Sequence, residues 1–132
     1  MAKAKRVKQL SFMMPDRAGL LLEVTTALAD TKVNISNICA YNMQGEANFM
    51  LTADSNAKAK KALAPLGVEI KEYDVFVVEM PNKPGELQKV AKKIADAGIN
   101  IIYLYGTTGS GRSVTGVFTT SDDAKAVKLI NK

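Results

Sequence analysis

Alternating apolar and polar residues over 7–14 indicate a β-strand with one face on a core. Pro15 ends this strand because proline has no backbone N–H to donate. Apolar residues then recur at helical spacing, at Leu20, Leu21, Val24, Ala27 and Leu28. This stripe predicts a helix that ends between Asp30 and Lys32.

The following stretch completes a β-α-β-β-α-β order. The expected elements are strands over 34–41 and 47–52, a helix over 56–63 and a strand over 68–72. Asp54, Ser55 and Asn56 are residue types that favour a helix start, and Pro65 stops the helix. This order of elements predicts an α+β domain with an antiparallel sheet.

The same pattern then occurs a second time. Residues 14–35 match residues 80–101 at nine of 22 positions when the chain is shifted by 66 residues. The second copy is expected to contain strands over 75–80, 101–105 and 114–119, a helix after the first of them, and a last helix over 124–130 that Ser121 caps. A repeat of this length indicates two small paired domains.

The second copy stops before any counterpart of the strand at 68–72. An uncovered sheet edge invites pairing with another chain, so we expect a homodimer to cover it. Only Tyr73 and Asp74 separate the strand at 68–72 from the next one, and residues 68–80 can therefore also form one long strand.

The composition argues against several kinds of functional site. The 132 residues include one Cys and no His or Trp. A zinc site of Cys and His, or a catalytic triad with an imidazole, is therefore not expected, and neither is a cofactor. A single Cys fits a reducing compartment, and no apolar run reaches the length of a membrane span. We expect a cytoplasmic protein that binds no membrane.

The net charge of +5 is concentrated in part at the N-terminus, at Lys3, Lys5, Arg6 and Lys8. We interpret this segment as a solvated tail that helps solubility. The alternative is an arm that binds nucleic acid or an anionic membrane. The remaining charges are scattered, which favours the solvated tail.

The two repeated loops carry the candidate binding chemistry. Gly19 and Gly85 precede helices whose first backbone N–H groups are unpaired and can hold a carboxylate. We expect Asn34 and Asn100, at the start of the second strand of each copy, to lie next to this loop, where Asp16 adds an acceptor. Carboxylate donors with an ammonium acceptor describe a pocket for a free α-amino acid. The same residues can instead end a strand, allow a tight turn and start the next strand.

The motifs that carry these loops resemble the ACT domain. They are Pro15-Asp16-Arg17-Ala18-Gly19-Leu20-Leu21 with Val33-Asn34-Ile35, and Pro81-Asn82-Lys83-Pro84-Gly85-Glu86-Leu87 with Gly98-Ile99-Asn100-Ile101. The resemblance implies two tandem ferredoxin-like units, 1–74 and 75–132, with helices on one face of each sheet and no final strand in the second. The first copy departs from the family pattern, with Ala18 in place of the usual proline and Lys32 in place of the usual glycine.

The resemblance also implies a function. ACT domains usually bind an amino acid near the loop after the first strand, where paired units meet, and so regulate a metabolic enzyme or a transcription factor allosterically. The positions that match are Asp16, Arg17, Ala18, Gly19, Leu20, Asn34 and Ile35 in the first copy, and Asn82, Lys83, Pro84, Gly85, Glu86, Asn100 and Ile101 in the second. The regulated enzyme is expected to be a separate chain, because no catalytic domain accompanies the two units.

Three other functions fit the same order of elements. A pairing module that binds no ligand would use the motifs only for structure. An RNA-binding domain is disfavoured, because residues 44–51 lack the aromatic and basic pattern of that module. An enzyme is not expected, since the carboxylates Asp16, Glu23, Asp122 and Asp123 accompany no nucleophile and base.

Overall fold

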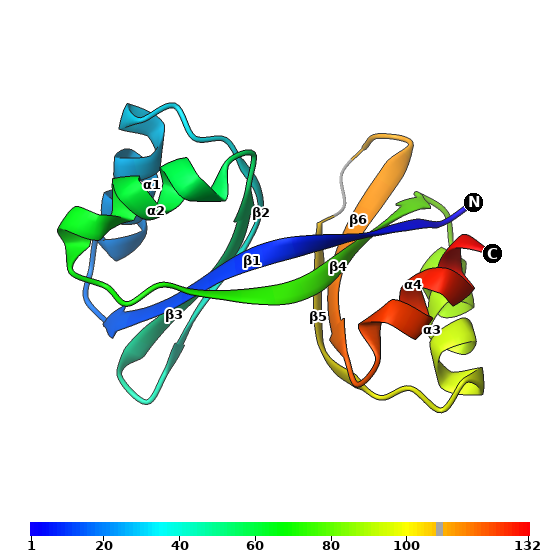
Figure 1. The fold of residues 1–132 in the computed structure, drawn as a ribbon. Coiled ribbons are helices and arrows are strands. Elements are labelled where there is room, and N and C mark those ends of the chain that lie inside the picture. Colours follow the sequence, from blue (N-terminus) through cyan, green and yellow to red (C-terminus); the bar gives the residue numbers. More distant parts are fainter. Residues whose placement is uncertain (108–109) are drawn as a thin grey trace. The chain divides into compact units, whose positions relative to one another are not determined.

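A computed structural model describes residues 1–107 and 110–132. The elements are β1 (Lys3–Pro15), α1 (Leu20–Asp30), β2 (Ile35–Met43), β3 (Glu46–Ala53), α2 (Asn56–Leu63), a 3-10 turn (Ala64–Leu66), β4 (Lys71–Pro81), α3 (Glu86–Asp96), β5 (Ile101–Thr107), β6 (Ser113–Thr120) and α4 (Asp123–Asn131) (Figure 1). The chain forms two compact units, one of residues 8–73 and one that joins residues 1–7 to residues 74–132. We had expected a division after residue 74.

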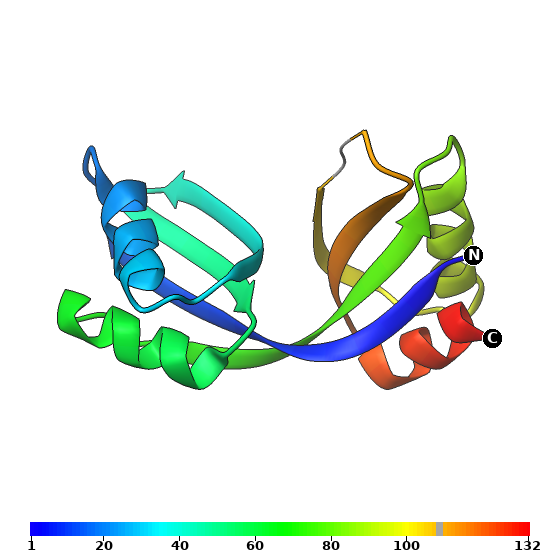
Figure 2. The same cartoon turned by 90° about the horizontal axis from the view of Figure 1, so that it is seen from above.

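The unit of residues 8–73 has the α+β architecture expected from the sequence. β3 lies between β1 and β2 and pairs antiparallel with both. α1 and α2 cover one face of these strands (Figure 2). The alternating residues Leu10, Phe12 and Met14 of β1 point to that face and are buried. The rings of Phe12 and Phe49 stack there, with centroids 5.0 Å apart.

The second unit repeats this plan. β6 lies between β4 and β5 and pairs antiparallel with both, and α3 and α4 cover one face. Phe76 and Phe118 stack in its core with ring centroids 5.3 Å apart. Val90 and Ile94, from the apolar stripe of α3, are buried beside them. The expected antiparallel sheet with helices on one face is therefore confirmed in both copies.

The missing final strand of the second copy is supplied by the start of the chain. β1 is the hydrogen-bonded neighbour of β4, and residues 1–7 belong to the same compact unit as β4. Ala4 is buried in the core of that unit. Our interpretation of Lys3, Lys5 and Arg6 as part of a solvated tail was therefore wrong, because their backbone belongs to β1. Their side chains are nevertheless exposed. The edge that we expected a second copy to cover is occupied by the chain itself.

Of the strand expected at 68–72, only residues 71 and 72 are in a strand, and they belong to a longer element. β4 runs without interruption from Lys71 to Pro81, which fits the alternative of one long strand. Val68 and Ile70, which precede it, pack against the core of residues 8–73. Each copy thus receives its fourth strand from residues that directly precede the first strand of the other copy.

The helix starts differ between the first and second helix of each copy. Ser55 caps α2, as expected, by accepting a hydrogen bond from the Lys58 backbone N–H at 3.3 Å. Asp122, and not the expected Ser121, caps α4 by accepting from the Lys125 backbone N–H at 3.1 Å. By contrast, α1 and α3 begin at glycines whose φ angles are 85° and 87° and receive no side-chain cap.

The C-terminal ends of α1 and α3 share one geometry. The N–H groups of Lys32 and Val33 donate to the carbonyls of Ala29 and Leu28, which is the Schellman arrangement. Lys32, which stands where the family pattern has glycine, takes a φ of 58°. At the end of α3 the same place is held by Gly98, with a φ of 71°. The left-handed conformation suits glycine and is less favourable for lysine.

Candidate functional site

The loop between β1 and α1 is tied to the hairpin between β2 and β3. Pro15 is the last residue of β1 and lies opposite Glu46. The next residue, Asp16, donates its backbone N–H to the Gly45 carbonyl at 2.9 Å. The chain then turns at Gly19 into α1. The loop and the hairpin therefore form one structural feature at this end of the sheet.

Polar side chains gather around this loop. The Asp16 carboxylate accepts a hydrogen bond from the side-chain amide of Asn42, which lies near the end of β2. Arg17 forms an ion pair with Glu23 in the first turns of α1. The hydrogen bond from Arg17 lowers the pKa of the Glu23 carboxyl, and the same contact raises the pKa of Arg17. The loop thus carries one paired cation and one carboxylate held by an amide.

A hollow of about 290 Å³ lies beside the start of α1. Its rim includes Asp16, Arg17 and Asn42, and its floor consists of side chains from the helix-facing side of β2 and β3. The full lining is Asp16, Arg17, Gly19, Leu20, Leu21, Ala40, Tyr41, Asn42, Ala47 and Phe49. The first backbone N–H groups of α1 have no partner within the helix and no side-chain cap from Gly19, so this end of the helix favours an anion.

Four of the expected site residues of the first copy line this hollow, namely Asp16, Arg17, Gly19 and Leu20. Ala18 lies in the same loop and is exposed. The sequence analysis did not identify Asn42, nor the floor residues Ala40, Ala47 and Phe49. The antiparallel direction of β2 and β3 could have indicated them, because the hairpin end of such a pair returns to the end of the first strand.

Asn34 and Ile35 lie at the opposite end of β2. The Asn34 N–H donates to the Asp54 side chain at 3.0 Å, and the Asp54 N–H donates to the Asn34 carbonyl at 3.0 Å. Ile35 is opposite Ala53, the last residue of β3. Our expectation that Asn34 lies next to the Pro15 loop was wrong. α1 carries the chain back along the sheet by about 1.5 Å per residue, so β2 starts far from that loop.

The corresponding loop of the second copy is also tied to its hairpin. The Asn82 backbone N–H donates to the Arg112 carbonyl at 2.8 Å, and its side-chain amide donates to the Gly111 carbonyl at 3.1 Å. Lys83, Pro84 and Gly85 follow as an exposed turn into α3. This places the expected residues of the second loop together at one end of the unit.

The remaining expected residues of the second copy are divided between two places. Glu86 begins α3 and accepts a hydrogen bond from Lys89 at 2.8 Å, which lowers the pKa of the Glu86 carboxyl. Asn100 lies at the start of β5, where its N–H donates to the Ser121 hydroxyl at 3.0 Å. Ile101 is opposite Thr120. Asn100 and Ile101 thus lie away from the loop, as Asn34 and Ile35 do in the first copy.

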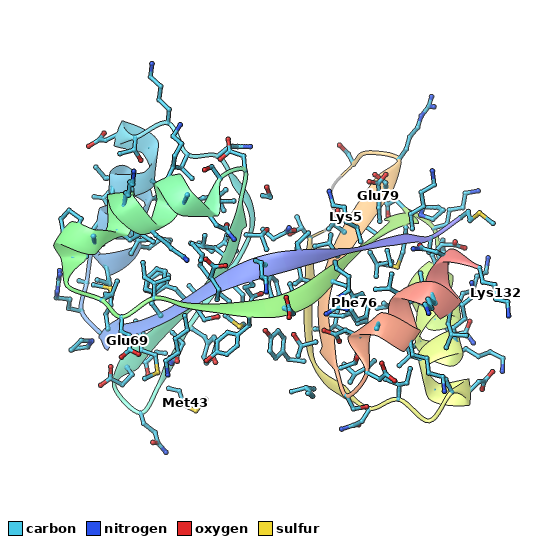
Figure 3. The ribbon with its side chains drawn as sticks, in the orientation of Figure 1. Lys5, Met43, Glu69, Phe76, Glu79 and Lys132 are labelled. Atoms are coloured by element: carbon cyan, nitrogen blue, oxygen red, sulfur yellow. The ribbon has the colours of Figure 1, made fainter. Side chains whose placement is uncertain are left out.

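A larger open hollow of about 570 Å³ follows the first residues of β1. It is lined by Met1, Ala2, Lys3, Ala4, Lys5, Val77, Glu79, Thr115 and Asn131. Lys5 and Glu79 contribute opposite charges to it, and both are labelled in Figure 3. None of the residues that the sequence indicated as binding residues lines this hollow.

The described part of the chain covers residues 1–107 and 110–132. No three His, Cys, Asp or Glu residues in this part of the chain lie close enough to hold a metal ion together. No helix within it has the length and apolar character needed to cross a bilayer.

Comparisons with known proteins agree with the fold. A family model described as an ACT domain pair matches residues 5–132. No curated protein matches the chain. The crystal structure of protein BT0572 from Bacteroides thetaiotaomicron is similar, with a TM-score of 0.86 and 28% identity over 96% of this chain and 87% of that one.

Two solved structures with lower identity share the fold. The ligand-free regulatory subunit of aspartate kinase from Thermus thermophilus has a TM-score of 0.69 and 19% identity, over 96% of this chain and 93% of that one. E. coli aspartokinase III in complex with lysine and aspartate has a TM-score of 0.57 and 13% identity, over 98% of this chain but 31% of that one.

Proposed function

Because this chain belongs to the family of ACT domain pairs, we propose that it is a regulatory module that binds a free amino acid and modulates a separate metabolic enzyme or regulator. The proposed site is the hollow beside the β1–α1 loop. The observation that carries the proposal is that this hollow combines an uncapped helix start with the Asp16–Asn42 pair.

The two charged groups of an amino acid match two parts of the hollow. Its α-carboxylate would accept hydrogen bonds from the first backbone N–H groups of α1, where the helix dipole favours negative charge. Its ammonium group would donate to the Asp16 carboxylate, which has acceptor capacity beyond the bond from Asn42. A ligand that carries a carboxylate and an ammonium group a short distance apart can bind the start of α1 and Asp16 at the same time.

Gly19 suits this arrangement because it has no side chain. A Cβ placed on Gly19 would meet no heavy atom within 4 Å, so the helix start is open to an approaching ligand. Ser55 and Asp122, by contrast, fill the corresponding places at α2 and α4 with their own side chains. In the proposed complex the ligand carboxylate accepts the hydrogen bonds that a capping side chain would otherwise accept.

In the second copy we propose the residues of the equivalent loop, Asn82 to Glu86, as a second binding segment. Its side chains differ from those of the first loop: Asn82 replaces the carboxylate of Asp16, and its amide donates to Gly111. The second loop thus lacks the acceptor that Asp16 offers to a ligand ammonium group, and the Glu86 carboxylate is already bonded to Lys89. The second segment should therefore bind amino acids more weakly than the first.

Regulation would follow if the ligand binds one conformation of the chain more tightly than another, since only differential affinity shifts such an equilibrium. Among structures with this fold, one was crystallised with lysine and aspartate. Amino acids are therefore the first compounds to test.

The test is thermal unfolding of the full chain with each of the twenty amino acids, followed by titration calorimetry of those that raise Tm. A ligand at 100 times its Kd stabilises the folded state by about 2.7 kcal/mol. Asp16→Asn should weaken binding at least tenfold, because it removes the charge facing the ammonium group. Asp30→Asn is the matched control, since Asp30 is exposed at the other end of α1.

Binding that is equally strong in the Asp16 and Asp30 variants would contradict the proposed location. Absence of binding by any amino acid, in calorimetry as well as in unfolding, would contradict the proposed function. The protein would then be better described as a pairing module that binds no ligand.

A further inference from the structure

The floor of the hollow in residues 8–73 is largely apolar, although Tyr41 and Asn42 also line the hollow and Ala40 is exposed. Ala47 and Phe49 from β3 and Leu20 from α1 are each more than nine-tenths buried. Ala40 of β2 is opposite Phe49, and Asn42 is opposite Ala47, so these residues share the helix-facing side of the sheet. A ligand whose charged groups bind at the rim would therefore direct its side chain onto alkyl and aromatic carbon.

Two alanines leave the room that such a side chain needs. Ala40 and Ala47 each present a single methyl group to the hollow. Phe49 does not swing into this space, because its ring is stacked on Phe12 with an angle of 10° between the ring planes. The volume of about 290 Å³ exceeds that of a glycine-sized ligand and accepts a side chain of several carbons.

The charged residues of the lining lie at the rim of the hollow and not on its floor. Among the described residues that line the hollow, the charged ones are Asp16 and Arg17, both in the loop at the rim. Arg17 is already paired with Glu23. A charged ligand side chain would meet no opposite charge beyond the rim, so placing it against the buried Ala47 and Phe49 is unfavourable.

The second copy does not share this floor. The repeat places Gly106 at the position of Ala40, and Gly106 is opposite Gly116 in β6. The space above Gly116 is occupied by the Phe118 ring, whose Cε1 lies 3.0 Å from the place of a Cβ, and by the Met80 methyl group at 3.6 Å. The alanine-lined space is thus a property of the first copy.

We propose that the ligand of the first copy is an amino acid with an aliphatic side chain of three or four carbons, the size of valine, leucine or isoleucine. This inference rests on the proposed function, because it assumes that the charged groups of an amino acid bind at the rim. Ala40 and Ala47 are its specificity-determining residues. They set the depth of the hollow and make no hydrogen bond to the ligand through their side chains.

The experiment is calorimetry of the full chain with the series glycine, alanine, valine and leucine, and with lysine and aspartate. Each additional carbon buried on the floor should strengthen binding roughly fourfold. Valine and leucine should therefore bind at least tenfold more tightly than glycine. Lysine and aspartate should bind at least tenfold more weakly than leucine.

Ala40→Leu tests the location of the floor. The added carbons fill the space next to Phe49, so the variant should lose affinity for leucine at least tenfold while its affinity for alanine changes little. Ala57→Leu is the matched control, because Ala57 is exposed on α2 and does not line the hollow. Ala40→Val provides a smaller change that suits a strand, should the leucine variant fold poorly.

The outcomes separate the two proposals. A charged or polar amino acid that binds tightly, loses affinity in Asp16→Asn and outcompetes leucine would overturn the aliphatic assignment and leave the proposed function standing. Equal affinity for leucine in the Ala40 and Ala57 variants would also overturn it. Failure of all compounds to bind would overturn both proposals. Both proposals would be supported if affinity rises from glycine to leucine and Ala40→Leu removes the gain for leucine.

Discussion

Asn131 holds the backbone of Ala4 through both ends of its side-chain amide. The Ala4 N–H donates to Asn131 Oδ1 at 2.6 Å, and Asn131 Nδ2 donates to the Ala4 carbonyl at 2.8 Å. The amide thus satisfies the donor and the acceptor of one residue of the strand, as a neighbouring strand would. The last residue of α4 thereby fixes the first residues of β1 in the unit that contains residues 74–132.

Asn131→Ala should destabilise this unit by about 2 kcal/mol, because two hydrogen bonds to partly buried groups are lost. Urea unfolding would measure the loss, and hydrogen exchange should show faster opening at the Ala4 amide. Lys132→Ala, a change at the adjacent exposed residue, should leave both unaffected. Equal exchange at Ala4 in the two variants would contradict the role of Asn131.

The two helix C-terminal ends allow a reciprocal test. Lys32→Gly should stabilise the protein by about 0.5–1 kcal/mol, because it relieves a left-handed conformation that lysine adopts at a cost. Gly98→Lys should destabilise it by about 1–2 kcal/mol for the same reason. Chemical denaturation of both variants measures the two changes. A stabilising Gly98→Lys variant would show that φ does not control this end of the helix.

Gly19→Ala should lower the free energy of unfolding by about 1–2 kcal/mol through backbone strain alone. Its φ is 85°, while a Cβ at this position would meet no atom within 4 Å. Gly111→Ala is the matched control, because the space around Gly111 is equally open and its φ lies outside the left-handed range. If Gly19→Ala and Gly111→Ala had the same free energy of unfolding, the claim of backbone strain at position 19 would be contradicted.

The pKa of Glu23 should respond to Arg17. Its pKa is lowered first by the hydrogen bond from Arg17, so Arg17→Gln should raise it toward the ordinary value of a glutamate carboxyl. Because the folded-state pKa lies below the unfolded-state value, the pair stabilises the fold above the ordinary carboxyl pKa. That stabilisation is lost as the pH falls through the lowered pKa.

NMR titration of the Glu23 carboxyl measures this shift directly. Lys89→Gln provides the comparison, because it should raise the pKa of Glu86 in the equivalent turn of α3 and leave Glu23 unchanged. An unchanged Glu23 pKa in Arg17→Gln would show that the ion pair does not persist in solution.

Local patterns in the sequence were sufficient for the helices, the turns and the repeat. The apolar stripe of α1 predicted the burial of Leu20, Val24 and Leu28, because side chains three or four residues apart share one helix face. Leu21 was placed in the same stripe and is 54% exposed. Asp54, Ser55 and Asn56 together predicted the start of α2, where the Ser55 side chain accepts a backbone N–H. These features depend on residues within one or two turns of each other, and adjacent sequence specifies them.

Only the tertiary structure decided which distant residues meet. The alternation at Lys3, Ala4 and Lys5 is compatible with a tail or a strand, and it becomes a strand because an open edge of β4 and the side chain of Asn131 receive it. Asn34 directly precedes β2 and Asn42 lies near its other end. Asn42 is the one bonded to Asp16, because the antiparallel register sets which end of β2 meets the loop. The sequence by itself determined two ACT-like copies and their loops. The exchange of strands and the apolar floor beside Asp16 arise from pairing between segments far apart in the chain, whose relative positions no local pattern encodes.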